Sequence, residues 1–220
     1  MPQTFLVAWF VALLTLAGHC SARAQTLSSP EQVLDRIVAH IEDDILFESE
    51  LRELGQFQKF SGSQTEDDGK LLGRLIDQWI VNTEAASAHF SRPTDAEVDL
   101  EIANMGKLFA PPETLETRLK QAGLDPAQLH RLVKQQLYLT RYLDYKFRGA
   151  VQIPQTEIEN YYRQTLAPQL AARGQAGPPL QSVEDEIREV LVQREINLRA
   201  DRWLEETRAH LRIERNLDSK

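Results

Sequence analysis

Six aromatic and thioether side chains are of the types that suit low-specificity peptide binding. The flexible Met side chain adapts to varied partners, and Trp and Tyr combine a large apolar face with one polar group. The same residue types are also common in ordinary protein cores, and the sequence leaves both roles open for each of them. We take them as candidate lining of a peptide-binding cleft: Trp79, Met105, Phe109, Tyr138, Tyr142 and Trp203.

No residue pattern predicts catalysis or metal binding. The histidines His40, His89, His130 and His210 are scattered and form no HExxH pair, and the sequence contains no GxSxG. Gly69-Lys70 resembles the end of a phosphate-binding loop, but Leu71 stands where that motif needs Ser or Thr. We therefore expect no enzyme activity, no catalytic residue, no metal site and no cofactor. Without an ATP-binding motif, any binding of clients is passive equilibrium binding.

The charge balance limits the classes of partner. The chain has 25 basic and 33 acidic residues and a net charge of −8. Nucleic acids and anionic lipid surfaces favour basic proteins, so neither is an expected partner. A polypeptide partner remains compatible with this charge.

The N-terminal segment predicts export from the cytoplasm. Phe5–Gly18 is almost continuously apolar but too short to span a bilayer, and Ala22-Arg23-Ala24 has the small-x-small pattern of a signal peptidase site. We expect residues 1–24 to be a signal peptide that is cleaved before Gln25, which gives a periplasmic or secreted protein without stable membrane insertion. Lipidation of Cys20 is an open alternative, although His19 stands where a small residue normally precedes a lipidated Cys. Cleavage before Gln25 would remove the only cysteine.

A hairpin is predicted soon after this segment. Ile37, Ala39 and Ile41 alternate with their neighbours at the period of a strand, Glu42–Asp44 suit a turn, and Ile45–Phe47 reads as the return strand. Glu48 and Ser49 are expected to supply a cap and a first-turn negative charge for the helix that follows. Because a lone hairpin is marginal in water, we expect a third strand, and the alternation at Leu211–Glu214 supplies it.

The rest of the chain predicts helices. Apolar residues recur at helical spacing, and Pro, Gly and capping residues mark the boundaries. Thr94 and Glu97 stand at capping-box spacing, and Asp125-Pro126 opens a long helix. The expected fold is therefore mainly α, with a small antiparallel sheet that joins the N-terminal hairpin to the C-terminal strand. Residues 25–166 form the N-terminal helical region, 167–181 a linker rich in Pro and Gly, and 182–220 a long helix and strand that complete the same domain. The predicted helices are Gly69 to about Phe90, Pro93–Leu108, Pro111–Gly123, Asp125–Gly149, Pro154–Tyr162 and Ser182–His210.

Five segments together resemble the N-terminal region of SurA-type periplasmic chaperones. They are LDRIVAHIEDDIL followed by ESEL, LLGRLIDQWIVNTEA, PTDAEVDLEIANM, LDPAQLHRLVKQQLYLTRYLD and PQTEIENYY. The late segment EDEIREVLVQREINLRADRWLEETR is similar to the C-terminal helix of the same module. The resemblance covers about 33–162 and 182–213. It implies a multi-helix chaperone core that binds unfolded polypeptides such as outer-membrane protein precursors.

The sequence departs from that family at one place. One or more parvulin-type prolyl isomerase domains usually precede the C-terminal helix in the family. Here the corresponding interval is only 163–181, whereas an independent domain needs at least about 50 residues. We therefore expect an ATP-independent chaperone or holdase without isomerase activity. The alternative is a non-catalytic envelope scaffold, or a swapped homodimer, that binds one folded partner.

Overall fold

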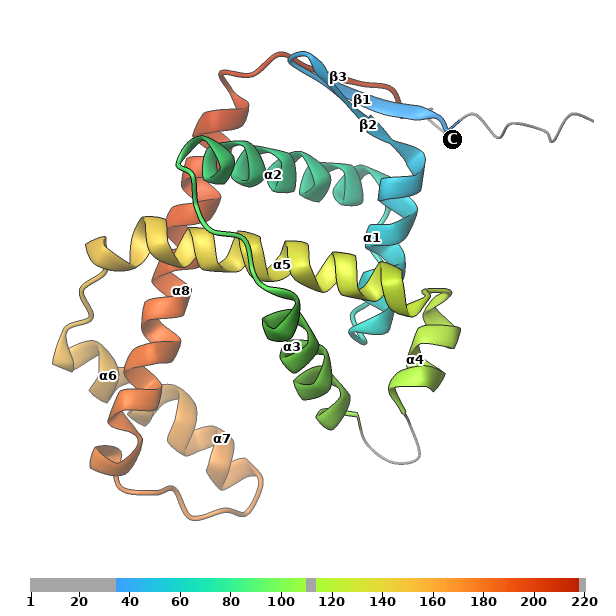
Figure 1. The fold of residues 1–220 in the computed structure, drawn as a ribbon. Coiled ribbons are helices and arrows are strands. Elements are labelled where there is room, and N and C mark those ends of the chain that lie inside the picture. The colour runs from blue at the N-terminus through green and yellow to red at the C-terminus, as the bar shows by residue number, and fades with distance from the viewer. Residues whose placement is uncertain (1–34, 110–113, 218–220) are drawn as a thin grey trace, which may run out of the picture. The chain divides into compact units, whose positions relative to one another are not determined.

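The computed structural model describes residues 35–109 and 114–217. The predicted signal peptide, residues 1–24, and the pair Pro111-Pro112 lie outside the described residues. Most of the described chain is helical, with one small sheet at the end where its first and last segments meet (Figure 1). This arrangement confirms the predicted mainly-α fold.

The sheet joins the two ends of the described chain. β1 (Ile37–Ile41) pairs antiparallel with β2 (Asp44–Phe47) on one side and with β3 (Ile213–Arg215) on the other, giving the order β2-β1-β3. The predicted third strand is therefore confirmed. The turn is tighter than expected, because Asp44 already belongs to β2 and Glu42 takes a positive φ of 50°.

The burial pattern of β1 differs from simple alternation. Val38, Ala39 and Ile41 are all fully buried, although Val38 was expected on the outer face. The register shifts between Ile37 and Ala39, as at a β-bulge. A bulge adds one residue to its strand and turns the following side chains, so both Val38 and Ala39 reach the core.

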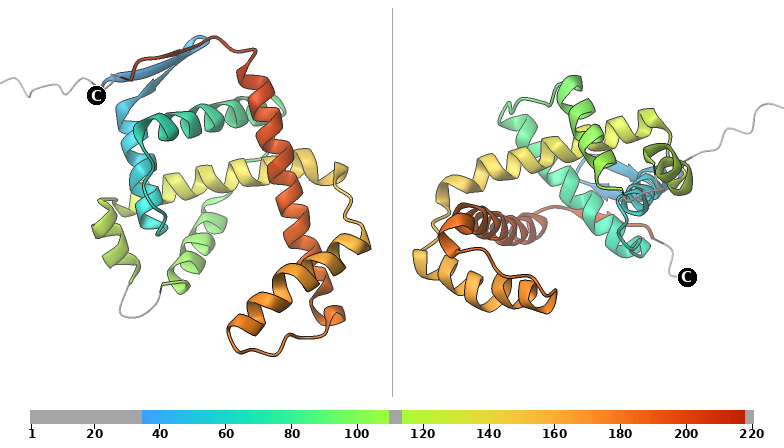
Figure 2. Two further views of the ribbon diagram at one scale, coloured as in Figure 1. Left: turned by 180° about the vertical axis from the view of Figure 1, so that it is seen from behind. Right: turned by 90° about the horizontal axis from the view of Figure 1, so that it is seen from below.

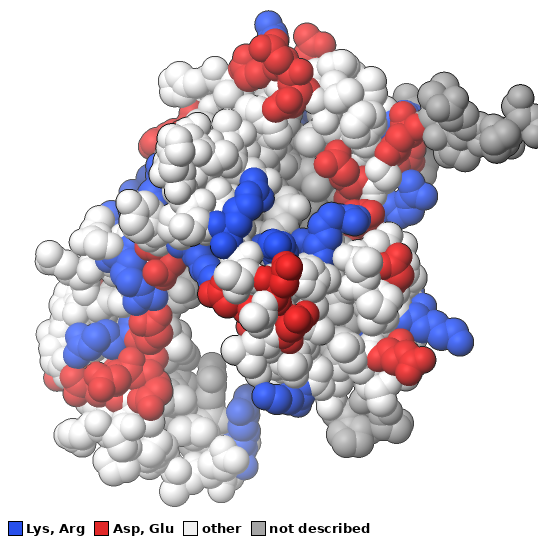
Figure 3. All heavy atoms as spheres, viewed as in Figure 1, with Lys and Arg blue, Asp and Glu red and all other residues white. Residues whose placement is uncertain are grey.

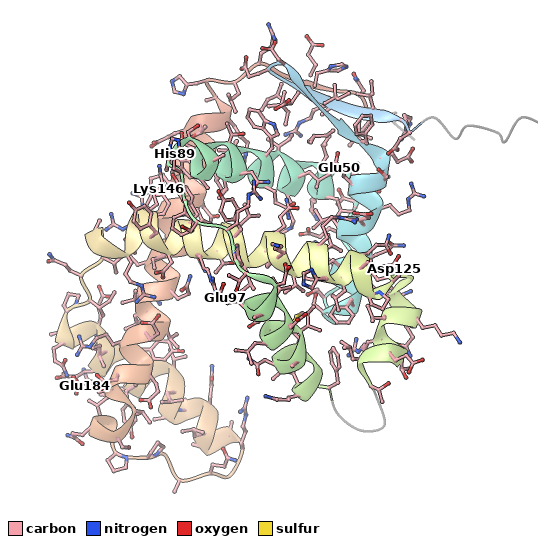
Figure 4. The ribbon with its side chains drawn as sticks, in the orientation of Figure 1. Glu50, His89, Glu97, Asp125, Lys146 and Glu184 are labelled. Carbon is pink, nitrogen blue, oxygen red and sulfur yellow. The ribbon has the colours of Figure 1, made fainter. Side chains whose placement is uncertain are left out.

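Two helices cover the sheet. α1 (Glu48–Phe60) and α2 (Asp68–Ser87) bury their leucines and isoleucines with β1 and β2 in one cluster, which also includes Tyr138, Leu139, Tyr142 and Leu204. The predicted cap of α1 was wrong, whereas the predicted negative charge in its first turn is confirmed at Glu48. Glu48 and Ser49 lie inside the helix, and the N-cap is Phe47, whose backbone N–H donates to the Glu50 side chain over 2.7 Å. Glu50 is labelled in Figure 4.

Three further helices follow α2. α3 (Asp95–Lys107) begins with the predicted capping box of Thr94 and Glu97. α4 (Leu115–Ala122) ends at Gly123, whose φ of +74° is the left-handed conformation that glycine adopts readily. α5 (Pro126–Phe147) is capped by Asp125 and continues into a 3₁₀ turn at Arg148–Ala150. These helices enclose a second cluster: Phe60, Val98, Leu119, Ala122, Leu124, Leu129 and Val133.

The predicted linker begins later than expected. α6 (Gln155–Tyr161) runs through a π turn at Tyr162–Leu166 into α7 (Ala167–Ala172), so residues 167–172 are helical. Pro168 has no backbone N–H for the helix, and wider hydrogen bonding ahead of a proline lets a helix continue past it. Only residues 173–179 remain between α7 and α8.

α8 (Leu180–Arg208) is the longest helix and serves two clusters. It starts at Leu180 rather than at Ser182, whose hydroxyl donates to the carbonyl of Pro179. Its first half packs Ile187 and Leu191 on Ile158 of α6, and its second half contributes Leu204 to the sheet cluster. Seen from behind, α8 crosses α5 on the side opposite to α3 (Figure 2). α5 thus has two different exposed flanks, one toward α3 and one toward α1 and α8.

Candidate functional site

A cavity lies on the side of α5 that faces α1 and α8. It has a volume of about 340 Å³ and is bounded by α1, α2, α5 and α8. We call it the four-helix pocket. Its lining residues are Leu54, Phe57, Gln58, Ser61, Arg74, Asp77, Gln78, Val81, Gln136, Leu139, Thr140, Leu143, Asp201 and Leu204.

The base of the four-helix pocket is apolar because helical spacing directs side chains from four helices to one place. On α5, Leu139 and Leu143 are four residues apart and share one face. Val81 and Leu204 reach the same pocket from α2 and α8, and both are buried in the sheet cluster. The base therefore offers apolar contact area backed by a packed core.

Three glutamines line the rim of this apolar base. Gln58 is committed within the protein, since its amide donates to Glu66 Oε2 over 2.8 Å and accepts from the Glu66 backbone N–H over 3.1 Å. Gln78 and Gln136 make single contacts at 3.5 and 3.2 Å, to Gln135 and Thr140. A primary amide carries two donors and an acceptor, so both retain capacity to bind the N–H and C=O groups of a peptide backbone.

One ion pair holds the α8 side of the pocket. Arg208 Nε donates to Asp77 Oδ1 over 2.6 Å, and so ties α8 to α2. Burial raises the pKa of Asp77, while the bond from Arg208 opposes that rise. Asp201 raises it further. The pocket edge thus contains a partly desolvated carboxylate that depends on its arginine.

Arg74 on the same rim is held by Glu66. Arg74 Nη2 donates to Glu66 Oε1 over 2.8 Å, and Nε donates to the second carboxylate oxygen. The hydrogen bonds from Arg74 and Gln58 lower the pKa of Glu66 to about 2. The loop before α2 is therefore anchored to α1 and α2 at its end.

The structure separates the six residues predicted from the sequence. Tyr138 and Tyr142 are buried core residues with the Phe90 ring between them, at centroid distances of 5.9 and 5.5 Å. Met105 and Phe109 pack on the second cluster, where Phe109 meets Phe60 edge-on at 5.7 Å. These four side chains contribute to two different cores.

The two predicted tryptophans are half-buried at the edge of the sheet cluster. Trp79 Nε1 donates to Asp44 Oδ2 over 2.9 Å, which ties α2 to β2. Trp203 packs against Phe147, and Lys146 Nζ lies 4.5 Å from its ring centroid. Lys146 is labelled at the end of α5 in Figure 4. None of the six predicted residues lines the four-helix pocket.

A second, larger cavity lies on the other side of α1. Its volume is about 440 Å³, and Leu51, Gly55 and Leu71 form part of its apolar surface. Charged residues of both signs surround it, including Arg52, Lys59 and Asp68. This rim is less suited than the glutamine rim to sequence-independent backbone binding.

The described residues lack the side-chain grouping of a metal site and the long apolar helix of a membrane span. Within residues 35–109 and 114–217, no three His, Cys, Asp or Glu side chains are grouped so that they could hold a metal ion. Over the same ranges, no helix has the length and apolar character needed to cross a bilayer.

Comparison with known proteins adds no assignment. The chain matches no protein-family model and no curated protein sequence.

Proposed function

We propose that this protein is an ATP-independent chaperone of the cell envelope that holds unfolded or extended polypeptides. The four-helix pocket is the observation that carries the proposal. Its apolar base accepts side chains of varied shape, and Gln78 and Gln136 offer amide groups to any peptide backbone. Binding of this kind depends little on the amino-acid sequence of the client, as a holdase requires. The resemblance to SurA-type chaperones agrees with it.

The surface charge is also compatible with polypeptide clients. On the face in Figure 3, blue and red side chains are interspersed, apart from the blue ones that gather over α5. The overall charge of −8 disfavours polyanions. We place the clients among exported proteins such as outer-membrane protein precursors, following the predicted signal peptide at residues 1–24.

Suppression of client aggregation tests this proposal. Several unrelated unfolded clients are diluted into buffer with the protein, and light scattering is followed. Thr140→Arg places a long charged side chain at the pocket and is expected to weaken suppression for every client. Thr83→Arg, at an exposed position of α2 outside the pocket, is the matched control and should act like the wild type. Wild-type protein without effect on any client would contradict the proposal.

The proposed chaperone works without prolyl isomerase activity. The interval between α6 and α8 contains the π turn, α7 and residues 173–179, and in that short interval the family normally has its catalytic domain. A protease-coupled proline-peptide assay is expected to stay at the uncatalysed rate. Catalysis that scales with protein concentration would overturn this part of the proposal.

A scaffold subunit or homodimer is the second candidate. Leu100 and Leu108 on and after α3 are 61% and 83% exposed, which favours an apolar contact with another folded protein or a second copy. Light scattering on a size-exclusion column distinguishes monomer from dimer. One stoichiometric folded partner, with no effect on unfolded clients, would favour this candidate over the chaperone.

A further inference from the structure

A small cationic pocket lies on the side of α5 that faces α3, away from the four-helix pocket. Its volume is about 140 Å³, and its lining residues are Asn82, Arg92, Pro93, Arg131, Lys134, Gln135 and Tyr138. Three of these described residues are cations and none is acidic, although the whole chain is acidic. Blue side chains gather over α5 in Figure 3, where the segment between α2 and α3 crosses that helix.

Arg92 is the cation of this pocket that lacks a carboxylate. Arg131 is engaged by Glu53 over 2.7 Å, and Lys134 by Asp95 over 2.7 Å. Arg92 makes no hydrogen bond or ion pair with any residue that the structure describes, and its guanidinium lies 4.7 Å from the centroid of the Tyr138 ring. Stacking on an aromatic face orients the guanidinium and leaves its in-plane N–H groups available to an anion.

Tyr138 is a fixed support for that guanidinium. Its ring is buried, and its hydroxyl donates to the carbonyl of Phe90 over 3.4 Å. This bond also holds the segment that leads to Arg92. Pre-orientation lowers the entropy cost of binding a carboxylate through two parallel hydrogen bonds.

Asn82 borders the same pocket but offers no acceptor to a ligand, because its Oδ1 is buried and closed to solvent. A ligand is therefore recognised through its anionic group. A client polypeptide of any sequence carries one α-carboxylate at its C-terminus, and this planar group matches the parallel N–H donors of a guanidinium.

We propose that this pocket binds the C-terminal residue of a polypeptide client. Arg92 and Lys134 hold the α-carboxylate, and the 140 Å³ cavity admits a side chain of modest size. Lys134 shares its charge between the client and Asp95. The proposal rests on the proposed chaperone function, and adds a terminus-specific site to the sequence-independent four-helix pocket.

Fluorescence anisotropy with two matched peptides tests the site. One extended peptide is made with a free C-terminal carboxylate and again as the C-terminal amide, with the label at the N-terminus. The free acid is expected to bind about fivefold more tightly, the scale of one exposed charge-assisted pair. Arg92→Gln removes this difference and leaves the affinity of the amide unchanged. Arg194→Gln on α8 is the matched control and preserves the difference.

The outcomes separate this inference from the chaperone proposal. Equal affinity for acid and amide, or a preference that survives both Arg92→Gln and Lys134→Gln, overturns the terminal site while peptide binding itself stands. Inorganic phosphate that competes as well as the free-acid peptide overturns recognition of a terminus and indicates a general anion site. No binding of either peptide overturns the chaperone proposal together with this one. A change of the Arg92 side-chain Nε–H NMR signal on adding only the free acid supports the site independently.

Discussion

The backbone N–H of Asn216 donates to the carbonyl of Val38 over 2.9 Å, so the last described segment of the chain completes the sheet that the first one begins. The Glu42 N–H donates in the same way to the carbonyl of Arg212 over 3.0 Å. Between these two bonds, β3 pairs with β1 in register. Leu211, Ile213 and Leu217 pack against the sheet cluster from this strand and its flanks.

Truncation after His210 is therefore expected to destabilise the whole protein. It removes the ladder to β1 and the apolar contacts of Leu211 and Ile213, each of which stabilises by up to about 1.5 to 3 kcal/mol when fully buried. Both side chains are half-buried, so the lower end of that range applies. Urea unfolding is expected at clearly lower concentration.

Hydrogen exchange locates this effect. The amides of β1 and β2 are expected to lose protection in the truncated protein, while those of α2 are less affected. Arg215→Gln, at an exposed position of β3, is the control and should change little. Equal protection of the hairpin with and without the tail would contradict the role of β3.

The ion pair between Asp77 and Arg208 is expected to show strong coupling. Arg208→Gln leaves a partly desolvated carboxylate without its partner, and should cost about 1 to 2 kcal/mol at neutral pH, between the values for exposed and buried pairs. Asp77→Asn together with Arg208→Gln should recover most of this loss. Additive effects in the double variant would show that the two residues do not interact.

The pH dependence of the Arg208→Gln variant has a defined sign. Burial raises the pKa of Asp77 in the folded state, and loss of Arg208 raises it further. A carboxyl with a raised folded pKa stabilises the fold when protonated, and that contribution is lost as pH rises through the folded pKa. The deficit of the variant is therefore expected to shrink between pH 7 and pH 4 in urea titrations.

Glu97 is expected to contribute to acid sensitivity in the opposite direction. Its carboxylate accepts from the backbone N–H and hydroxyl of Thr94 and from Arg141, and these bonds lower its pKa to about 2 (Figure 4). The stabilisation is present above the ordinary value of 4.5 and is lost as pH falls toward 2.

The matching measurement compares urea unfolding at pH 5 and pH 2.5. The wild type should lose more stability on acidification than Glu97→Gln, in which a Gln still fits the capping box. Glu101→Gln in the same helix should lose as much as the wild type. If Glu97→Gln lost as much stability on acidification as the wild type, the partners of Glu97 would not lower its pKa in solution.

The third apolar cluster, formed by Ile158, Ile187 and Leu191 between α6 and α8, is expected to unfold as a separate local unit. Ile158 is fully buried against Ile187 and Leu191, so Ile158→Ala creates a cavity worth about 2 to 4 kcal/mol. Because this cluster is separate from the sheet cluster, hydrogen-exchange protection should fall in α6 and the first half of α8 while β1 and α2 keep theirs. Leu170→Ala on α7, which is outside the three clusters, is the milder control. Uniform loss over all helices would contradict a separate unit.

Local sequence patterns were sufficient for most of the fold. The alternation of Ile37, Ala39 and Ile41 predicted β1, and the capping residues Thr94 and Asp125 located the starts of α3 and α5. Each of these signals involves residues close together in the chain. Two helix boundaries were missed because the usual residue signal is absent there. At Phe47 the N-cap has no polar side chain, and Glu50 accepts from its backbone N–H instead. At Pro168 a π turn carries the helix onward past the proline.

The four-helix pocket could not be predicted from the sequence, for a different reason. Its lining comes from four helices, and the residues that distinguish it, Gln78, Gln136 and Thr140, are common on any solvated helix face. Aromatic residues offered a clearer signal, yet Tyr138 and Tyr142 are core, since the same chemistry that binds peptides also fills interiors. One usable hint was present: Gln136, Leu139, Thr140 and Leu143 follow helical spacing on a second face of α5.

Anisotropy titration of one labelled, extended peptide with three proteins tests peptide binding in the four-helix pocket most directly. Wild type and Thr83→Arg are expected to bind with equal affinity, and Thr140→Arg at least tenfold more weakly, because its side chain occupies the space between α5 and α8. Circular dichroism and urea unfolding establish that all three proteins are folded. Binding by Thr140→Arg that equals the wild type would contradict the assignment of client binding to this pocket.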